Sequence, residues 1–435
     1  MNLVRRFNLA PVAVLALLAA GCFPPVPEGE TSTSAAVTPA GTMTAVTGFA
    51  NPGALDMYEY VPGGALSGAL VVALHGCTQS ASAYVGAGWS SAADVYGMVV
   101  LYPEQVTANN ENRCFNWYEQ DDTLRNGESL SIVNAVQASI SAHGLDAQRV
   151  YVTGLSAGGA MTAVLLAGYP DKGTSNTTFT GFAGGAVMAG LPFESACTGA
   201  DHTSCPTGSA YGDAFTAMNP GKNLTPAQWG DRVRSATPNA HSWPRVSVWG
   251  GTSDTTVAPM NVSEIVDQFT NVNGVSATPT TTDTVEGQAH QSFADASGGV
   301  RVETYRVSGM PHGTAIDPAF DFGVAGKSCG TAQAYILDKG ICSTYYALKF
   351  WNEADAVATT TPPTTTPPTT TPPLTVACSA ATSSNYAHVQ AGRAHDSYGM
   401  AYANGSNASL GLDNLFFHAT LHSTTPGVWA LGACP

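Results

Sequence analysis

The segment that most limits the fold is VYVTGLSAGGAMTAVLLAGYP, residues 150–170, in which a strand, a sharp turn and a helix follow one another. The apolar run at its start has the length of a buried strand, and the small apolar residues at its end continue for the length of a helix. Between them stands the pattern Gly-x-Ser-x-Gly around Ser156. Its two glycines permit a turn tight enough to expose a serine hydroxyl above a sheet. The segment therefore predicts an α/β domain with a candidate nucleophile at Ser156.

Similar apolar runs recur across residues 45–355 and alternate with longer helical patterns, such as 129–143 and 158–167. The runs that we interpret as buried parallel strands ending in turns are ALVVALHG (69–76), MVVLYP (98–103), RVYVTG (149–154) and RVSVWGG (245–251). Strands that alternate with helices in this way predict one α/β domain with a parallel sheet. In such sheets, functional residues gather at the carboxyl ends of the strands.

A serine hydroxyl is a weak nucleophile until a histidine takes its proton and an acid orients that histidine. In hydrolases with this kind of turn, the acid and then the histidine follow the serine along the chain. Asp254 stands in the loop after VSVWGG, and His312 follows the strand candidate VETYRV. We therefore expect Ser156, Asp254 and His312 to be a catalytic triad for acyl transfer to water. The rivals later in the chain are His241 and His290 for the base, and Asp283 and Asp317 for the acid.

Negative charge that develops on a substrate oxygen needs two backbone N–H donors. One is expected from Ala157, which follows the serine, and the other from the loop after an early strand. LHGCTQS (74–80) is that loop, so Cys77 is the second expected donor. His75 is expected to shape the loop through its ring, and it is a candidate for substrate binding with Trp117. For Trp117, a subsite for the substrate backbone and packing in the core are both open.

The N-terminus has the pattern of an export signal, assigned to residues 1–21, with two arginines before a short apolar run and small residues at its end. The run is too short to span a bilayer as a mature helix. LLAAGC also resembles a bacterial lipoprotein box, although Ala19 stands where leucine is usual. Two fates of Cys22 therefore stay open, which are lipidation, with attachment to a membrane, and loss with the signal.

The cysteine count fits an exported chain, because eight of the nine cysteines remain once Cys22 is set aside. Spacing suggests the pairs Cys77–Cys114, Cys197–Cys205, Cys329–Cys342 and Cys378–Cys434. No CxxC pair is present, so a zinc site is not expected.

A repeat, TTTPPTTTPPTTTPP at 359–373, separates the α/β domain from a tail. Such a run favours extended polyproline II structure, and 15 residues at about 3.1 Å each span about 45 Å. We divide the mature chain into a Pro/Thr-rich tether (22–44), a catalytic domain (45–355), a linker (356–374) and a small disulfide-stapled module (375–435).

The net charge of the chain limits the kinds of molecule that it can bind. The chain has 16 basic and 31 acidic residues, a formal net charge of -15, which disfavours nucleic acid. No phosphate loop, dinucleotide fingerprint or metal-ligand cluster stands out, so no cofactor is expected. No obligate protein partner is evident from the sequence.

Four stretches together, LHGCTQSASAY, NRCFNWY, GLSAGGAMTAVLLAGYPD and WGGTSDTTV, resemble the extracellular short-chain polyhydroxyalkanoate depolymerases and their feruloyl and acetylxylan esterase relatives. The resemblance covers most of residues 45–350 and implies an α/β-hydrolase fold. It implies the same triad, and an oxyanion segment at 75–77. The tail resembles the C-terminal substrate-binding domain of poly(3-hydroxybutyrate) depolymerases, on the positions Cys378, Tyr386, His388, Arg393, Tyr402, Leu410, Leu412 and Phe416.

The resemblance implies a secreted serine esterase that acts on an insoluble polyester granule. A binding module on the granule surface would raise the local concentration of the catalytic domain, and a spacer would let that domain reach many chain ends. The alternative is a feruloyl or acetylxylan esterase with a polysaccharide-binding tail. Against it, Trp429 is the only tryptophan of the tail, so a planar row of tryptophans is missing. A third reading is an anchored binding protein with a decayed enzyme domain, which the intact triad pattern disfavours.

Overall fold

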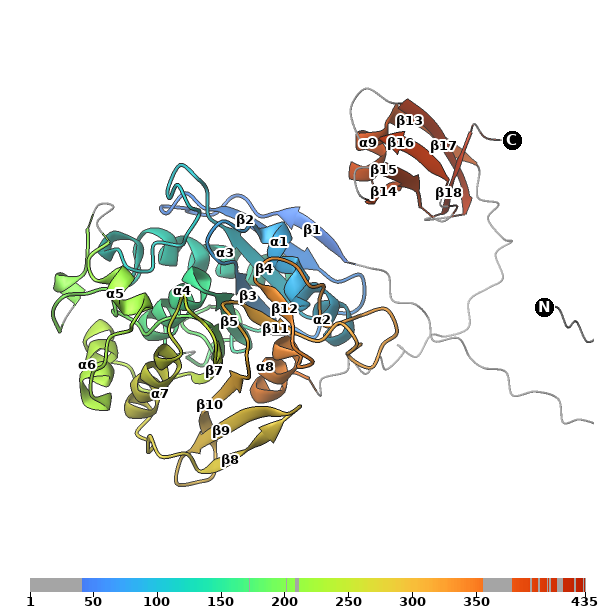
Figure 1. Ribbon diagram of the computed structural model, residues 1–435. Coiled ribbons are helices and arrows are strands. Elements are labelled where there is room, and N and C mark those ends of the chain that lie inside the picture. The colour runs from blue at the N-terminus through green and yellow to red at the C-terminus, as the bar shows by residue number, and fades with distance from the viewer. Residues whose placement is uncertain are drawn as a thin grey trace, which may run out of the picture. The chain divides into compact units, whose positions relative to one another are not determined.

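The computed structural model describes residues 41–354, except 172, 201 and 208–210, and parts of residues 378–434. The chain divides into two compact units, residues 1–360 and 361–435, which are described separately (Figure 1). The expected signal, residues 22–40 of the expected tether, with Cys22, and the Thr-Pro linker lie outside the described residues. Residues 42–44 of that tether instead belong to the edge strand β1 (Thr42–Ala45), so the α/β domain begins before the predicted residue 45. Among the described helices, none is long and apolar enough to cross a membrane.

A mixed sheet of ten strands forms the centre of the first unit, in the order β1-β2-β4-β3-β5-β6-β7-β10-β9-β8. The strands from β4 to β10 in this order are parallel, and the pairs at both edges are antiparallel. The strands are β1 (Thr42–Ala45), β2 (Asp56–Val61), β3 (Leu70–Leu74), β4 (Val99–Glu104), β5 (Val150–Leu155), β6 (Gly184–Met188), β7 (Arg245–Gly251), β8 (Thr281–Val285), β9 (Gln288–Ala294) and β10 (Val300–Val307). A separate parallel pair joins β11 (Thr314–Ile316) to β12 (Ile336–Asp338).

Helices cover both faces of this sheet, as Figure 1 shows. One face packs against α3 (Gly127–His143), α4 (Ala157–Gly168), α6 (Pro226–Ala236) and α7 (Met260–Val272). The other packs against α1 (Ala81–Tyr84), α2 (Trp89–Tyr96) and α8 (Ser343–Trp351). Short elements in the loops are η1 (Val85–Ala87), η2 (Gln120–Asp122), η3 (His202–Ser204) and α5 (Ala214–Met218).

The central strands are mostly apolar because both of their faces are buried, and β3 is apolar throughout. In β3, Leu70, Val72 and Leu74 join the core on the α4 side, and Val71 and Ala73 join the core on the α8 side. Burial on both faces is the reason that these runs could be recognised in the sequence. The predicted α/β fold with a parallel central sheet is confirmed, and the four predicted strands lie within two residues of their expected bounds.

The second unit is small, and its described core consists of Ala394, Ala403 and Leu421 with a few partly buried neighbours. Two three-stranded sheets, β13-β17-β18 and β14-β15-β16, and one helix make up its described structure. Their bounds are β13 (Ser379–Ser384), α9 (Asn385–Gln390), β14 (Ala394–Ser397), β15 (Met400–Ala403), β16 (Ser409–Leu412), β17 (His418–Thr425) and β18 (Val428–Leu431). A bond between Cys378 and Cys434 joins the two ends of the unit. A core of this size gains much from such a covalent closure.

Candidate active site

Ser156 lies at the junction of β5 and α4, in a backbone conformation that L-residues rarely adopt, with φ 57° and ψ −116°. Its N–H donates to the carbonyl oxygen of Met188 at 2.9 Å, which fixes the turn to the end of β6. Conformations of this kind cost about 1–3 kcal/mol and persist only where the surroundings impose them. The strained turn places the serine at the carboxyl end of a central strand, next to the first turn of a helix.

The two glycines of the turn are required because neither position has room for a Cβ atom. A Cβ on Gly154 would lie 2.5 Å from the carbonyl carbon of Gly158, and a Cβ on Gly158 would lie 2.5 Å from the carbonyl oxygen of His75. Both obstacles are backbone atoms, which cannot move aside as a side chain could. The Gly-x-Ser-x-Gly pattern is thus explained by the close approach of β5, α4 and the loop after β3.

Asp254 and His312 form a pair in the loops after β7 and β10, in which Asp254 is buried and His312 is partly exposed. The Nδ1 of His312 lies 2.8 Å from Oδ2 of Asp254. The other carboxylate oxygen, Oδ1, accepts the N–H groups of Thr256 and Val257, each at 2.9 Å. Because the carboxylate can only accept, the ring carries its proton on Nδ1, which leaves Nε2 as the basic nitrogen. This arrangement can hold a histidine as a general base.

One pocket of about 190 Å³ brings the predicted residues together. Its lining consists of Gly76, Cys77, Thr78, Gln79, Leu155, Ser156, Met218, Thr256, His312 and Tyr335. Ser156 and His312 therefore face one space, and Asp254 lies behind His312. Apolar side chains from Leu155, Met218 and Tyr335 make up part of the wall.

The rival residues lie elsewhere. The Nδ1 of His290 pairs with Asp283 at 2.7 Å, and its Nε2 lies 3.5 Å from a carboxylate oxygen of Glu303. These three residues line a larger cavity of about 480 Å³, which shares no lining residue with the pocket of Ser156. Asp317 caps its own turn by accepting the N–H of Ala319. The geometry thus favours Asp254 and His312 over their rivals.

The backbone N–H groups at the centre of the expected oxyanion loop differ in whether they already have an acceptor. Among residues 76–79, the N–H of Gly76 donates to Oε1 of Gln79, that of Thr78 to the carbonyl of Asn112, and that of Gln79 to the carbonyl of Gly76. No acceptor is recorded for the N–H of Cys77 in the part of the chain that the structure describes. Ala157 begins α4, so its N–H has no acceptor within the helix. The two expected donors are therefore both available to a substrate oxygen.

The contacts of His75 and Trp117 distinguish between the roles that the sequence left open for them. His75 is fully buried behind the oxyanion loop, where its Nδ1 bonds the carbonyl of Gly76 at 2.7 Å and its Nε2 accepts the N–H of Gln105 at 3.0 Å. Burial lowers the pKa of His75 to about 4, so the ring is neutral. Trp117 is 6% exposed and belongs to the core on the α4 side. Neither side chain lines the pocket, so neither is placed to touch substrate there.

The eight cysteines of the described residues form four disulfides in the pairing that their spacing suggested. The bond between Cys77 and Cys114 anchors the oxyanion loop to residues 112–114. The bond between Cys197 and Cys205 braces the long segment between β6 and α6, which carries Met218 into the pocket.

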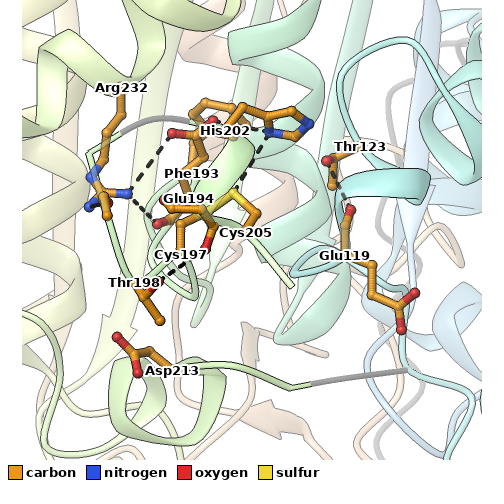
Figure 2. The surroundings of a disulfide bond; sticks show 12 residues. Glu119, Thr123, Phe193, Glu194, Cys197, Thr198, His202, Cys205, Asp213 and Arg232 are labelled. Carbon is orange, nitrogen blue, oxygen red and sulfur yellow. Dashed lines mark hydrogen bonds and ion pairs between the residues drawn. A yellow bond between two sulfur atoms is a disulfide. The ribbon is translucent and has the colours of Figure 1, made fainter. Parts of the chain in front are cut away.

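Figure 2 shows the surroundings of this second disulfide. Glu194, His202 and Cys205 bring a carboxylate, an imidazole and a sulfur within 4.8 Å of one another, as a metal site would. However, the sulfur of Cys205 is bonded to Cys197, and a disulfide sulfur is not the thiolate that binds zinc. Arg232 also donates to the carbonyl of Glu194 at 2.8 Å. The cluster is therefore a structural brace.

The family model described as esterase PHB depolymerase matches residues 55–289. The chain belongs to this family. It is 45% identical to poly(3-hydroxyalkanoate) depolymerase C of Paucimonas lemoignei, over 71% of this chain and 70% of that protein. It is 32% identical to poly(3-hydroxybutyrate) depolymerase of Ralstonia pickettii, over 84% of this chain and 86% of that protein.

The solved structure of acetyl xylan esterase from Aspergillus awamori matches with a TM-score of 0.53 and 27% identity, over 62% of this chain and 94% of that one. These findings agree with the resemblance stated above. As a member of the esterase PHB depolymerase family with this α/β fold, the chain is a carboxylic ester hydrolase.

Several residues that line the pocket were not predicted from the sequence, among them Gln79, Met218 and Tyr335. Met218 and Tyr335 reach the pocket from long segments without any motif, so no signal marked them. Gln79 stands two residues after Cys77, within the loop that we identify as the oxyanion loop. A glutamine at that place could have been recognised as a side chain able to form hydrogen bonds within the loop.

Proposed function

We propose that this esterase is exported and hydrolyses a polyester of the poly(3-hydroxybutyrate) type to short hydroxyacid oligomers through an acyl-enzyme. The observation that carries the proposal is the single pocket that holds Ser156, His312 and the unpaired N–H of Cys77, in a chain 45% identical to a polyhydroxyalkanoate depolymerase. The four disulfides support an oxidising compartment outside the cytoplasm.

In the proposed mechanism, Nε2 of His312 takes the proton of Ser156 as its Oγ attacks the ester carbonyl carbon. Asp254 stabilises the imidazolium that forms, and the N–H groups of Cys77 and Ala157 bind the oxyanion. His312 returns the proton to the leaving alkoxide, the hydroxyl end of the next polymer segment. A water molecule, activated by the same nitrogen, then attacks the acyl group and releases the acid.

Large apolar side chains stand exposed around the pocket, which supports an uncharged polymer surface as substrate. Tyr335, which lines the pocket, is 45% exposed, and Phe215 is 65% exposed on the helix that carries Met218. The ring of Tyr211 packs on Phe215, with centroids 5.2 Å apart. Tyr211 and Phe215 thus form an exposed aromatic pair on the segment that carries Met218, and exposed apolar groups that lie together mark interaction sites.

The domain division completes the proposal. Residues 45–355 carry the chemistry, residues 375–435 bind the granule, and the Thr-Pro linker spans the distance between them. Attachment to a membrane through a lipidated Cys22 is a further proposal, which incorporation of labelled palmitate and its loss in Cys22→Ala would test.

The second candidate is an acetylxylan or feruloyl esterase. It is favoured by the match to an acetyl xylan esterase structure over 94% of that chain. The two candidates share the triad and differ in substrate, so one paired assay separates them. We would measure release of 3-hydroxybutyrate oligomers from polymer, and of acetate and ferulate from plant xylan. The proposal predicts oligomers as the main product, and preferential release of acetate or ferulate would replace it by the second candidate.

A further inference from the structure

Gln79 is a buried glutamine, 7% exposed, whose side-chain amide joins two walls of the Ser156 pocket. Its Oε1 accepts the N–H of Gly76 at 2.9 Å, and its Nε2 donates to the carbonyl of Ala334 at 3.1 Å. We propose that Gln79 is a positioning residue, which aims the N–H of Cys77 at the oxyanion and holds the Tyr335 segment against His312. This inference rests on the acyl-transfer chemistry of the proposed function.

The amide fits its two partners in one orientation only. The N–H of Gly76 needs an acceptor, and the carbonyl of Ala334 needs a donor, so exchange of the amide oxygen and nitrogen would break both bonds. A carboxamide satisfies both needs with one group. Neither an aliphatic side chain nor an ionised carboxylate of the same length can do so.

Planarity of the peptide group explains how this bond acts on the oxyanion donor. The carbonyl of Gly76 and the N–H of Cys77 belong to one trans peptide, so they point in opposite directions. The carbonyl is held by the Nδ1 of His75 at 2.7 Å and by the backbone N–H of Gln79 at 3.2 Å. These bonds therefore direct the N–H of Cys77 away from His75.

The glycine at position 76 explains why the adjoining peptide needs these hydrogen bonds to keep its orientation. Gly76 has no Cβ and little intrinsic preference for one backbone conformation, so the adjoining peptide can rotate with little steric resistance. A rotated peptide would turn a carbonyl, an acceptor, to where a donor is needed. Gln79 opposes the rotation on both sides of Gly76, through its side-chain oxygen on one and its backbone N–H on the other.

The second bond of the amide reaches the wall beside the proposed base. Ala334 precedes Tyr335, which adopts a left-handed conformation with φ 62° and packs its ring edge-on against His312, with centroids 6.1 Å apart. The carbonyl of Tyr335 accepts the N–H of Thr314 at 2.8 Å. Gln79 thus ties the oxyanion loop to the segment that borders His312.

Other contacts already secure the loop to the fold. The disulfide from Cys77 to Cys114 and the bond from the N–H of Thr78 to Asn112, at 2.7 Å, remain when Gln79 is replaced. Loss of the amide should therefore change the orientation of the N–H of Cys77 more than it changes folding.

The test compares Gln79→Ala and Gln79→Glu with the wild type, and with Gln148→Ala as a control at an exposed glutamine bond. For each protein, kcat and KM are measured on a soluble short-chain p-nitrophenyl ester, with the melting temperature. The inhibition constant of a boronic acid, which forms a tetrahedral adduct with a nucleophilic serine, reports the oxyanion site separately from substrate binding.

For Gln79→Ala we expect kcat to fall about 10- to 100-fold, less than when an oxyanion donor is removed outright. KM should stay within about twofold, and the boronate should bind more weakly by a factor similar to the loss in kcat. Gln79→Glu adds a pH signature. The introduced carboxyl can make both bonds when protonated and one when ionised, so its kcat relative to wild type should rise as pH falls.

Unchanged kcat and boronate affinity in Gln79→Ala would overturn the proposal, as would a rise in KM alone. A large fall in melting temperature, together with a pH-independent ratio for Gln79→Glu, would assign Gln79 to folding alone and overturn it too. Failure of the proposed function would look different. If Ser156→Ala retained hydrolysis, or if the ester were cut and polyester were not, the chemistry or the substrate would be at fault.

Discussion

Replacement of Asp254 by asparagine should disable the proposed base while leaving the fold intact. Oδ1 of Asp254 accepts two backbone N–H groups, from Thr256 and Val257, and Oδ2 accepts the Nδ1–H of His312. An asparagine must keep its oxygen on the two N–H groups, because its NH₂ cannot accept from them. That NH₂ then faces His312, whose Nδ1 must become an acceptor. The proton moves to Nε2, and the ring can no longer take the proton of Ser156.

The expected loss follows from this change of tautomer. In a Ser-His-Asp triad of another protein, the same substitution lowers kcat about 10⁴-fold, which corresponds to about 5.4 kcal/mol of activation free energy. We expect Asp254→Asn to lose activity to a similar extent on a soluble butyrate ester. Its melting temperature should stay within about 4 °C of wild type, because both backbone N–H groups keep an acceptor.

Asp254→Ala is the matched comparison, since it removes the acceptor of both backbone N–H groups as well as that of the ring. Each buried donor left without a partner costs about 1–3 kcal/mol, so this variant should lose stability as well as activity. If Asp254→Asn kept more than a tenth of wild-type kcat, Asp254 would not orient the base, and the triad assignment would be refuted.

Three further predictions concern the turn at Ser156, the disulfides and a histidine outside the site. Gly158→Ala should lower the melting temperature and abolish activity, since the new Cβ would meet backbone atoms of the loop after β3; a stable, active variant would contradict the turn geometry. Reduction of the disulfides should destabilise the protein, by about 4 kcal/mol for the bond that closes a separation of 37 residues, and native protein should show no free thiol by Ellman titration. Burial alone would lower the pKa of His290, but its bonds to Glu303 and Asp283 outweigh burial and raise that pKa above 6.5. This stabilisation is complete below about pH 6.5 and is lost as pH rises through the raised pKa, so unfolding measured against pH should show a decline that His290→Gln lacks.

The parts of the fold that the sequence could predict are those in which one segment carries its own signal. The four strands that were predicted, β3, β4, β5 and β7, are mostly apolar, so their positions could be predicted closely. The edge strands β8 and β9 went unnoticed because their sequences, TTDTV and QAHQSFA, are mostly polar; β8 is largely exposed and β9 is half-buried. β6 was missed for another reason, since it is short and opens with two glycines, one of which makes room for Leu166.

The residues of the candidate site also fall into those with a local sequence signal and those without one. Ser156 lies in a local strand–turn–helix pattern, and Asp254 and His312 follow strands, so all three could be proposed from chain order. Met218 lies on α5, in a long segment without a recognisable motif. The path of that segment depends on the disulfide between Cys197 and Cys205 and on packing against residues distant in the sequence. For Trp117 the sequence could not choose between a subsite and the core, because a tryptophan near a disulfide has the same sequence context in either place; the structure puts it in the core.

The most direct test of the account is the turbidity of a poly(3-hydroxybutyrate) granule suspension with three proteins, namely the full chain, the chain ended at Ala358, and full-length Ser156→Ala. We expect clearing by the full chain, much slower clearing by the shortened chain with soluble esters still cut, and granule binding without clearing by Ser156→Ala. Absence of clearing by the full chain, with soluble esters still hydrolysed, would contradict the polyester assignment and leave the plant cell-wall ester candidate in its place.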